Sequence, residues 1–327
     1  MIYANGEVFL LQTRNTSYFF RKTKTGHLEH LHYGASVISA FAYDKAVEKG
    51  NIEETFSTGK DGLTSIANAI GPKHYFAGGN MISYSDENSD VALEMLGLEM
   101  SSFGKGDIRE PFVELTYSDG NTTSDFLFDS YRIQKGVTPL KTLPFSYAED
   151  DIAVNAAFAD GTSEGEDQRG AVKDAPQQLV VTLKDAGYNA RLELIYTIYP
   201  DVDVITRSAI LYNDSDKDIK IERLLSAQLD FDTPSLKLTS FHGRWADEMG
   251  KHEAACTGGK VVSEELSAGE SGSRSNPFVI VSDISADDNH GDCYGVNLVY
   301  SGNHYEALSS NSINMSRFVC GIQPTGF

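Results

Sequence analysis

The stretch from Ser101 to Pro111 gathers residue types that active sites use. It reads SSFGKGDIREP, with two glycines around a lysine, followed by Asp107, Arg109 and Glu110. In a phosphate-binding loop, glycines would expose backbone amides to the anion and the lysine would neutralise it. The spacing is not that of a Walker loop, and the residues after Asp107 predict a strand rather than a helix N-terminus. We therefore exclude a nucleotide-binding loop here.

The two carboxylates of this stretch suggest a second chemistry. Asp107 and Glu110 could act as nucleophile and acid in glycoside hydrolysis, with Arg109 clamping the substrate. Alternatively, Gly104 and Gly106 shape a bend, and Arg109 forms a partly buried ion pair at the start of the next strand. We favour the second interpretation, because neighbouring carboxylates are far more often solvated or salt-bridged than catalytic. It predicts that Arg109 is substantially buried and paired with a carboxylate.

Three histidines, His27, His30 and His32, lie together in HLEHLHYG. His30 and His32 would share one face of a strand, which is how two metal ligands can be placed. No carboxylate or cysteine partner accompanies them in a ligand pattern, so packing of a strand near the surface is the favoured interpretation. We predict no metal site and no cofactor.

The only tryptophan, Trp245, lies in FHGRWADEMGKHE, with His242, Arg244 and Asp247 close by. A tryptophan beside an arginine and carboxylates could stack on a sugar face. It could also be an anchor buried in the core or in an interface, which we favour because tryptophan is typical of such centres. The Gly-x-Ser-x-Gly match at residues 161–165, GTSEG, lies in a polar loop rather than between a strand and a helix, so the sequence does not predict the nucleophile elbow of a Ser-His-Asp triad.

Strands must position all of these residues, because short β-branched and aromatic runs bounded by turn residues recur along the chain. Residues 191–200 alternate apolar and polar side chains, interrupted by Ile195. Three turn signals lie between such runs and predict hairpins or an antiparallel meander: Asp119–Gly120, Asn213–Asp216 and Ser301–Asn303. The sequence predicts an all-β fold of antiparallel sheets.

Helical periodicity is weak and is confined to two places, residues 40–49 and 62–70. Both lie in an irregular region, residues 35–90, that we expect to leave the sheets as loops and short helices. No loop demands a domain boundary, so we predict one domain over residues 1–327.

The composition excludes several classes of protein. The formal net charge is −20 over 327 residues, without a compensating cluster of basic residues, so nucleic acid and anionic membranes are not expected partners. The three cysteines are odd in number and widely spaced, which favours free thiols over a disulfide framework. The N-terminus lacks the basic start, the apolar run and the small-residue cleavage site of a secretory leader, and no segment approaches 18 consecutive apolar residues. We therefore expect a soluble cytoplasmic protein.

Several motifs in fixed order resemble the N-terminal part of the bacterial α-galactosidases of glycoside hydrolase family 36. They are NTSYFF, GHLEHLHYG, LEMSSFGKGDIREPFVELTYSDGNTTSDFLF, LELIYTIYPDVDVITRSAILYN, LLSAQLDF, FHGRWADE, SNPFVIV and YGVNLVYSGN. The resemblance spans almost the whole chain. It implies a large two-sheet β-supersandwich, of the galactose mutarotase-like kind, placed before a (β/α)8 barrel.

The resemblance also implies where the chemistry of the family lies. The catalytic aspartates of the family lie on the barrel, and their motifs do not occur here, so we expect no catalytic residue in this chain and no activity from it alone. The full-length enzyme is expected to hydrolyse terminal α-galactosides such as melibiose and raffinose with retention. A free-standing carbohydrate-binding β-sandwich module is the alternative.

The partners implied by the resemblance are the chain's own barrel, α-galactoside oligosaccharides and further copies in a tetramer. In the family, a loop of this domain reaches the mouth of a neighbouring active site. By position it corresponds to residues 71–87, in which Asn80 and Tyr84 are the candidates for the rim of the pocket. The other motif residues, Asp107, Arg109, Glu110, His242 and Trp245, are expected to have structural or interface roles.

Overall fold

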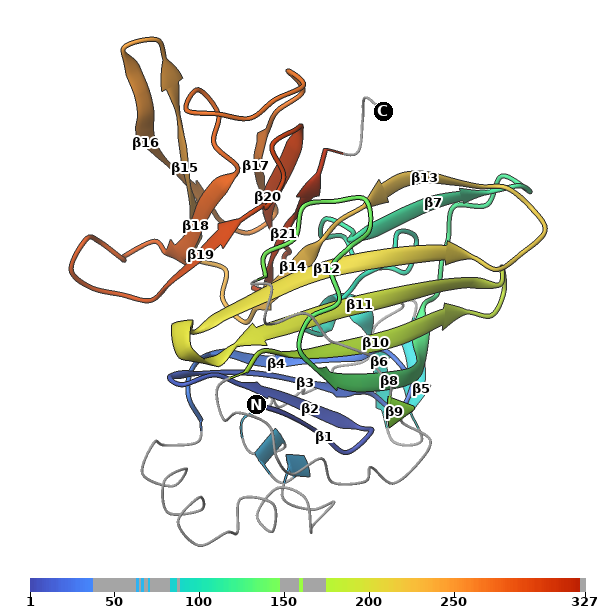
Figure 1. Ribbon diagram of the computed structural model, residues 1–327. Coiled ribbons are helices and arrows are strands. Elements are labelled where there is room, and N and C mark those ends of the chain that lie inside the picture. Colours follow the sequence, from blue (N-terminus) through green and yellow to red (C-terminus); the bar gives the residue numbers. More distant parts are fainter. Residues whose placement is uncertain are drawn as a thin grey trace, which may run out of the picture. The chain divides into compact units, whose positions relative to one another are not determined.

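In the part of the chain that the structure describes, the regular elements are mainly antiparallel β-strands with little helix, which confirms the predicted all-β class (Figure 1). A computed structural model describes residues 1–37, 63–64, 66–67, 70, 83–86, 89–147, 159–160 and 175–323. Within the range that we expect to be one domain, the residues group into two compact units. No helix among the described residues is long and apolar enough to cross a membrane.

The first unit comprises Met1–Ala77, Phe126–Lys141 and Ser146–Asp214, and its two sheets form stacked layers (Figure 1). One sheet has the order β1-β2-β3-β4 and the other β12-β11-β10-β8-β9. The strands are β1 (Ile2–Ala4), β2 (Val8–Gln12), β3 (Thr16–Lys22), β4 (Leu28–Ala35), β8 (Leu127–Lys135), β9 (Ala159–Asp160), β10 (Gln177–Asp185), β11 (Ala190–Tyr199) and β12 (Val204–Asn213), with a 3-10 turn, η3, at Pro200–Val202.

Aromatic side chains join the two layers of this unit. Phe20 of β3 stacks on Tyr196 of β11 with 5.3 Å between ring centroids, and Phe9 of β2 meets the edge of Tyr131 of β8 at 5.2 Å. Ile195, which breaks the alternation of β11, is itself buried. Eight of the ten residues of β11 are buried, so both faces of this strand are covered.

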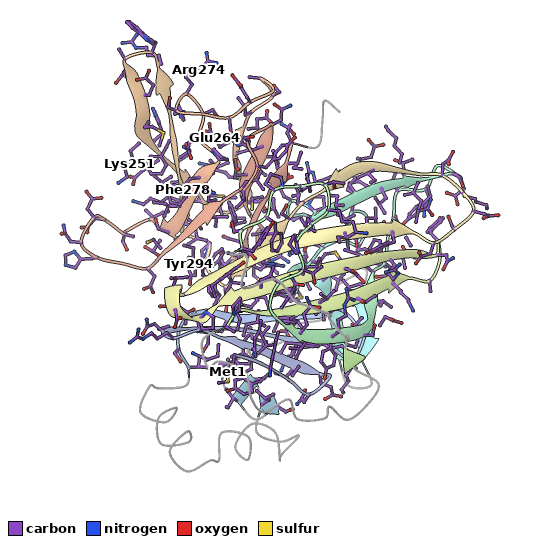
Figure 2. The ribbon with its side chains drawn as sticks, viewed as in Figure 1. Met1, Lys251, Glu264, Arg274, Phe278 and Tyr294 are labelled. Carbon is purple, nitrogen blue, oxygen red and sulfur yellow. The ribbon has the colours of Figure 1, made fainter. Side chains whose placement is uncertain are left out.

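The second unit comprises Gly78–Asp125, Thr142–Phe145 and Ser215–Phe327. Its sheets have the orders β14-β21-β20-β17, β16-β15-β18-β19, β13-β7 and β5-β6. The strands are β5 (Ser83–Asp86), β6 (Ser89–Ala92), β7 (Val113–Tyr117), β13 (Ile219–Leu224), β14 (Ala227–Phe231), β15 (Leu236–Arg244), β16 (Asp247–Cys256), β17 (Val261–Glu265), β18 (Phe278–Asp283), β19 (Cys293–Asn297), β20 (His304–Ser310) and β21 (Ser316–Ile322), with a 3-10 turn, η1, at Leu93–Met95. Figure 2 shows the side chains of Lys251 on β16 and Phe278 on β18, and the latter stacks on Phe241 of β15.

The three turn signals do not join paired strands, so the predicted hairpins and meander are wrong. Asp119–Gly120 lies in a turn, in which Gly120 N donates to Tyr117 O, but β7 pairs with β13 and β8 pairs with β10 and β9. Likewise β12 pairs with β11 rather than β13, and β20 pairs with β17 and β21 rather than β19. Turn residues reverse or bend the chain, but burial of the following strand decides which sheet it joins.

The predicted helical segment at residues 62–70 is partly described. Residues 63, 64, 66, 67 and 70 have helical backbone, and buried Leu63 and Ala67 pack in one cluster with Val8, Leu10 and Phe19. The predicted segment at residues 40–49 lies outside the described residues.

Candidate functional site

The bend of SSFGKGDIREP requires its glycines. Gly104 and Gly106 have φ of +84° and +83°, the left-handed region that side chains rarely adopt. A Cβ atom on Gly104 would lie 2.5 Å from Oγ1 of Thr123, so the chain also passes too closely for any side chain. Lys105 forms an ion pair with Asp125 at 3.1 Å. The glycines thus shape a bend, and the lysine has a carboxylate partner within the protein.

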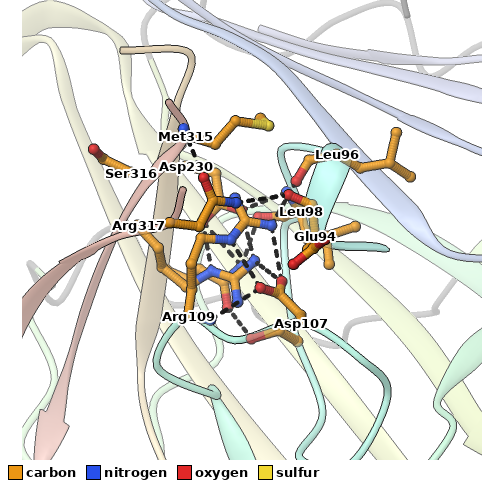
Figure 3. Close-up of polar contacts among 12 residues, drawn as sticks. Glu94, Leu96, Leu98, Asp107, Arg109, Asp230, Met315, Ser316 and Arg317 are labelled. Atoms are coloured by element: carbon orange, nitrogen blue, oxygen red, sulfur yellow. Dashed lines mark hydrogen bonds and ion pairs between the residues drawn. The ribbon is translucent and has the colours of Figure 1, made fainter. Parts of the chain in front are cut away.

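Arg109 is buried, with 3% of its surface exposed, and is held by two carboxylates, as the structural interpretation predicts (Figure 3). Its Nε and Nη2 donate to Oδ1 and Oδ2 of Asp107 at 2.9 and 2.8 Å, a bidentate arrangement. Its Nη1 lies 3.2 Å from Oδ2 of Asp230, close enough for an ion pair, although the angles do not give a hydrogen bond.

Arg317 of β21 completes a buried ionic quartet with Asp107, Arg109 and Asp230 (Figure 3). Its Nε and Nη2 donate to Oδ1 and Oδ2 of Asp230 at 2.8 and 2.7 Å, and Nη2 lies 2.7 Å from Oδ2 of Asp107. Two guanidinium groups face two carboxylates, so the formal charge of the quartet is zero. This balance is what allows four charged groups to be buried together.

The electrostatics of the quartet keep its members charged. Burial alone would raise the pKa of Asp107, but the charges of Arg317 and Arg109 outweigh it and the pKa lies below its ordinary value. Burial would lower the pKa of Arg317, but Asp107 and Asp230 raise it above its ordinary value. Asp107 is therefore closed to solvent and remains ionised, which is the opposite of a proton-transferring acid.

The quartet also binds backbone groups of the segment that precedes it. Nη2 of Arg109 donates to the carbonyl oxygens of Leu96 at 2.8 Å and Leu93 at 3.3 Å. Leu98 N donates to Oδ2 of Asp230 at 2.8 Å. These bonds attach residues 93–98 to the strands that carry Asp230 and Arg317, so the role of the quartet is to fix the fold of the second unit.

Glu110 belongs to a different cluster. Nη1 of Arg223 donates to its Oε2 at 2.6 Å, and the hydroxyl of Tyr305 donates to the same oxygen at 3.1 Å. Burial and the charge of Glu110 raise the pKa of Tyr305. Asp107 and Glu110 thus face different arginines, and this arrangement does not support a nucleophile and an acid sharing one substrate.

Trp245 lies at the turn between β15 and β16 with 86% of its surface exposed. Its interpretation as an anchor of the core is therefore wrong, because residues 244–249 of this hairpin are all exposed. An interface role for Trp245 stays a prediction. His242 packs within the same hairpin, where its ring stacks on His252 with 3.6 Å between centroids.

A chain of polar side chains, formed by half-buried Ser275 and buried His304 and Glu306, was not expected from the sequence. His304 Nδ1 lies 2.8 Å from Oε2 of Glu306, and Ser275 Oγ lies 3.3 Å from Nε2. The order resembles a catalytic triad, but Ser275 N donates to Gly272 O and Asn276 N donates to Phe241 O. The amides nearest the serine are thus already used and do not form an oxyanion hole. The signal available in the sequence was His304 and Glu306 two residues apart, on one face of a strand.

The remaining predicted residues lie apart from these clusters. His30 packs edge-on against Tyr18 at 5.0 Å, whereas Nε2 of His32 lies 3.0 Å from Ala35 O, so the two rings do not share a ligand. Asn80 lies outside the described residues. Tyr84 is in β5, of which only the backbone is described.

Comparisons with known proteins give one consistent result. The model of the glycosyl hydrolase family 36 N-terminal domain matches residues 26–327. Alpha-galactosidase 1 of Pediococcus pentosaceus is 26% identical over 98% of this chain and 37% of its own length. The crystal structure of the α-galactosidase from Lactobacillus brevis is 27% identical with a TM-score of 0.73, over 97% of this chain and 36% of that one.

A variant of the α-galactosidase AgaA from Geobacillus stearothermophilus, solved in complex with raffinose, has the same fold. It is 24% identical with a TM-score of 0.75, over 98% of this chain and 38% of that one. The chain therefore spans little more than a third of the length of these relatives.

Proposed function

Because this chain belongs to glycosyl hydrolase family 36 as its N-terminal domain, we propose that it is the non-catalytic β domain of an α-galactosidase. The full-length enzyme would hydrolyse terminal α-galactosides such as melibiose and raffinose with retention. The domain would support oligomer assembly, and its Asn80 and Tyr84 would contribute to the rim of a neighbouring active site. The observation that carries the proposal is the family match over residues 26–327, in a chain spanning 37% of the length of a curated α-galactosidase.

The state of the carboxylates supports a non-catalytic role. A retaining glycosidase needs two carboxyl groups about 5 Å apart on either side of the scissile bond, one of them able to give up a proton. Asp107 is closed to solvent between two arginines, and Glu110 is held by Arg223 and Tyr305. Neither group is free to meet a sugar.

The test compares two polypeptides on an aryl α-galactoside. One is this 327-residue chain, and the other is extended downstream to the length of the α-galactosidase relatives. We expect turnover by the longer polypeptide only. Turnover by the short chain that is lost in Asp107→Asn, while the protein stays folded, would overturn the proposal and restore the paired-carboxylate interpretation.

A second candidate function is a carbohydrate-binding module, and the exposure of Trp245 favours it. An indole ring exposed beside Arg244 and Asp247 has the residue types that hold a sugar by stacking and hydrogen bonds. Calorimetry with galactose and raffinose separates the two functions. A module binds sugar as the isolated chain and loses binding in Trp245→Ala, whereas a domain that only lines a neighbouring pocket does not bind alone.

A further inference from the structure

Strand β16 forms one edge of the sheet β16-β15-β18-β19 (Figure 1). It is ten residues long, and all of them except Gly250 and Cys256 are exposed. Among the described residues, no strand pairs with its outer edge. A long exposed edge offers a row of backbone donors and acceptors to another strand, which is a feature that proteins otherwise cover or interrupt.

The hydrogen bonds of β15 reveal which residues of β16 face outward. Gly243 N donates to Arg274 O and Asn276 N donates to Phe241 O, so the odd-numbered residues of β15 bond away from β16. The even-numbered residues of β15 therefore bond toward β16, where His242 faces Gly250 and Ser240 faces His252. It follows that the even-numbered residues of β16 bond inward.

The backbone groups at the outer edge of β16 consequently belong to its odd-numbered residues. Met249 N donates to Ser273 O, which leaves Lys251, Glu253 and Ala255 to present an N–H and a C=O outward. In an antiparallel pair, a residue whose N–H and C=O point toward the partner strand lies opposite a residue whose N–H and C=O point back toward it. A second β16 strand can therefore pair with this edge only in registers that place odd-numbered residues opposite odd-numbered residues.

The charges select one register from this set. A twofold axis at Lys251 or at Glu253 would place like charges directly opposite each other, which is destabilising. An axis at His252 places Lys251 opposite Glu253 twice, and each such pair also exchanges two backbone hydrogen bonds. Lys251 is 49% and Glu253 40% exposed, and the two already form an ion pair with each other at 3.2 Å, while Glu253 also pairs with Lys237 and Lys251 with Asp288. A second strand in this register would therefore add opposite charges beside pairs that exist within one chain. The strand is thus complementary to itself about His252.

From this geometry we propose that β16 is a dimerisation edge, which pairs antiparallel with β16 of a second copy of this chain about a twofold axis at His252. The occupant is a second copy because the edge matches its own sequence in a register with opposite charges facing. The inference deepens the assembly role proposed above by naming the strand that carries it.

Disulfide trapping tests the register. In a Cys293→Ser background, which removes the exposed native thiol, His252→Cys would place two thiols at the axis. Residues facing each other there have Cα atoms about 4.5 Å apart, within the range of a disulfide. Ala254→Cys is the matched control, because two copies would lie roughly 13 Å apart along the strands. We expect a covalent dimer from His252→Cys only, and equal trapping of both variants, or of neither, would overturn the register.

Charge exchange tests the pairing without a new covalent bond. Sedimentation of the 327-residue chain should show a dimer that Glu253→Lys weakens about tenfold, because two attractive pairs become repulsive. Lys251→Glu should do the same, and the double variant should restore the affinity. A dimer unaffected by Glu253→Lys would refute pairing through β16 but keep the assembly role. A monomer at all concentrations would refute both the pairing through β16 and the assembly role. The galactoside assay tests the non-catalytic role and does not depend on the oligomeric state.

Discussion

Replacing Asp107 by asparagine should destabilise the second unit strongly. The variant keeps the shape of the side chain but leaves Arg109 and Arg317 with Asp230 as their one carboxylate, so a positive charge remains uncompensated where side chains are 0–3% exposed. Removing one partner of a buried ion pair typically costs about 3–5 kcal/mol. Small domains are stable by only about 5–15 kcal/mol, so the loss should be visible in an ordinary urea titration.

A double-mutant cycle isolates the charge balance from the loss of contacts. Arg317→Met alone leaves a net negative charge, whereas Asp107→Asn with Arg317→Met leaves Arg109 facing Asp230 and restores neutrality. We therefore expect the double variant to be more stable than the sum of the two losses, by about 0.5–3 kcal/mol.

The control is the exposed pair of Lys220 and Glu222, in which Lys220 is 72% exposed. Lys220→Gln should change the unfolding free energy by less than about 1 kcal/mol. All variants are compared by urea denaturation followed by circular dichroism. A loss of similar size for Asp107→Asn and Lys220→Gln, or an additive cycle, would refute the account of the quartet.

Three further predictions use the same titration. Because the pKa of Asp107 is lower in the folded than in the unfolded chain, its ionised form stabilises the fold above about pH 3.9, and this stabilisation is lost as the pH falls through the folded-state pKa. The difference in unfolding free energy between the native chain and Asp107→Asn should therefore narrow below about pH 4. Gly104→Ala should cost at least about 1 kcal/mol more than Gly120→Ala, since both have positive φ but only Gly104 would contact Thr123; equal losses would contradict the steric argument. Trp245→Ala should change stability by less than about 0.5 kcal/mol, because the ring is exposed, whereas a loss of several kcal/mol would mean that the ring is buried.

What the sequence predicted well depends on residues close together in the chain. The alternation of apolar side chains gave the all-β class, because a strand buries every second residue. Gly104 and Gly106 were expected at a bend, and both have positive φ. Arg109 was expected to be buried with a carboxylate, and Asp107, two residues away, is one of its partners.

What the sequence did not predict depends on pairing between distant segments. Asp230 and Arg317 hold the other half of the quartet, 87 positions apart, and no spacing rule connects them. The same limit explains the wrong hairpins. A turn signal describes four residues, whereas the pairing of a strand depends on the apolar face that it must cover. The strand β13 accordingly pairs with β7, which lies far from it in the sequence.

The triplet Lys251-His252-Glu253 illustrates how local and distant information combine. Its two opposite charges lie one residue before and one residue after His252 in any conformation. Such a triplet on an exposed strand is ordinarily only a solvated surface. The triplet can support pairing with a second copy only because β16 is an edge strand whose odd-numbered residues direct their N–H and C=O groups outward. That parity is set by Gly243 and Phe241, which bond to the segment around Arg274 and Asn276. A shift of one residue would turn Lys251 and Glu253 inward to β15 and offer His252 to the edge instead. The capacity for self-pairing therefore follows from the register of one hairpin, which the pattern of charges alone does not determine.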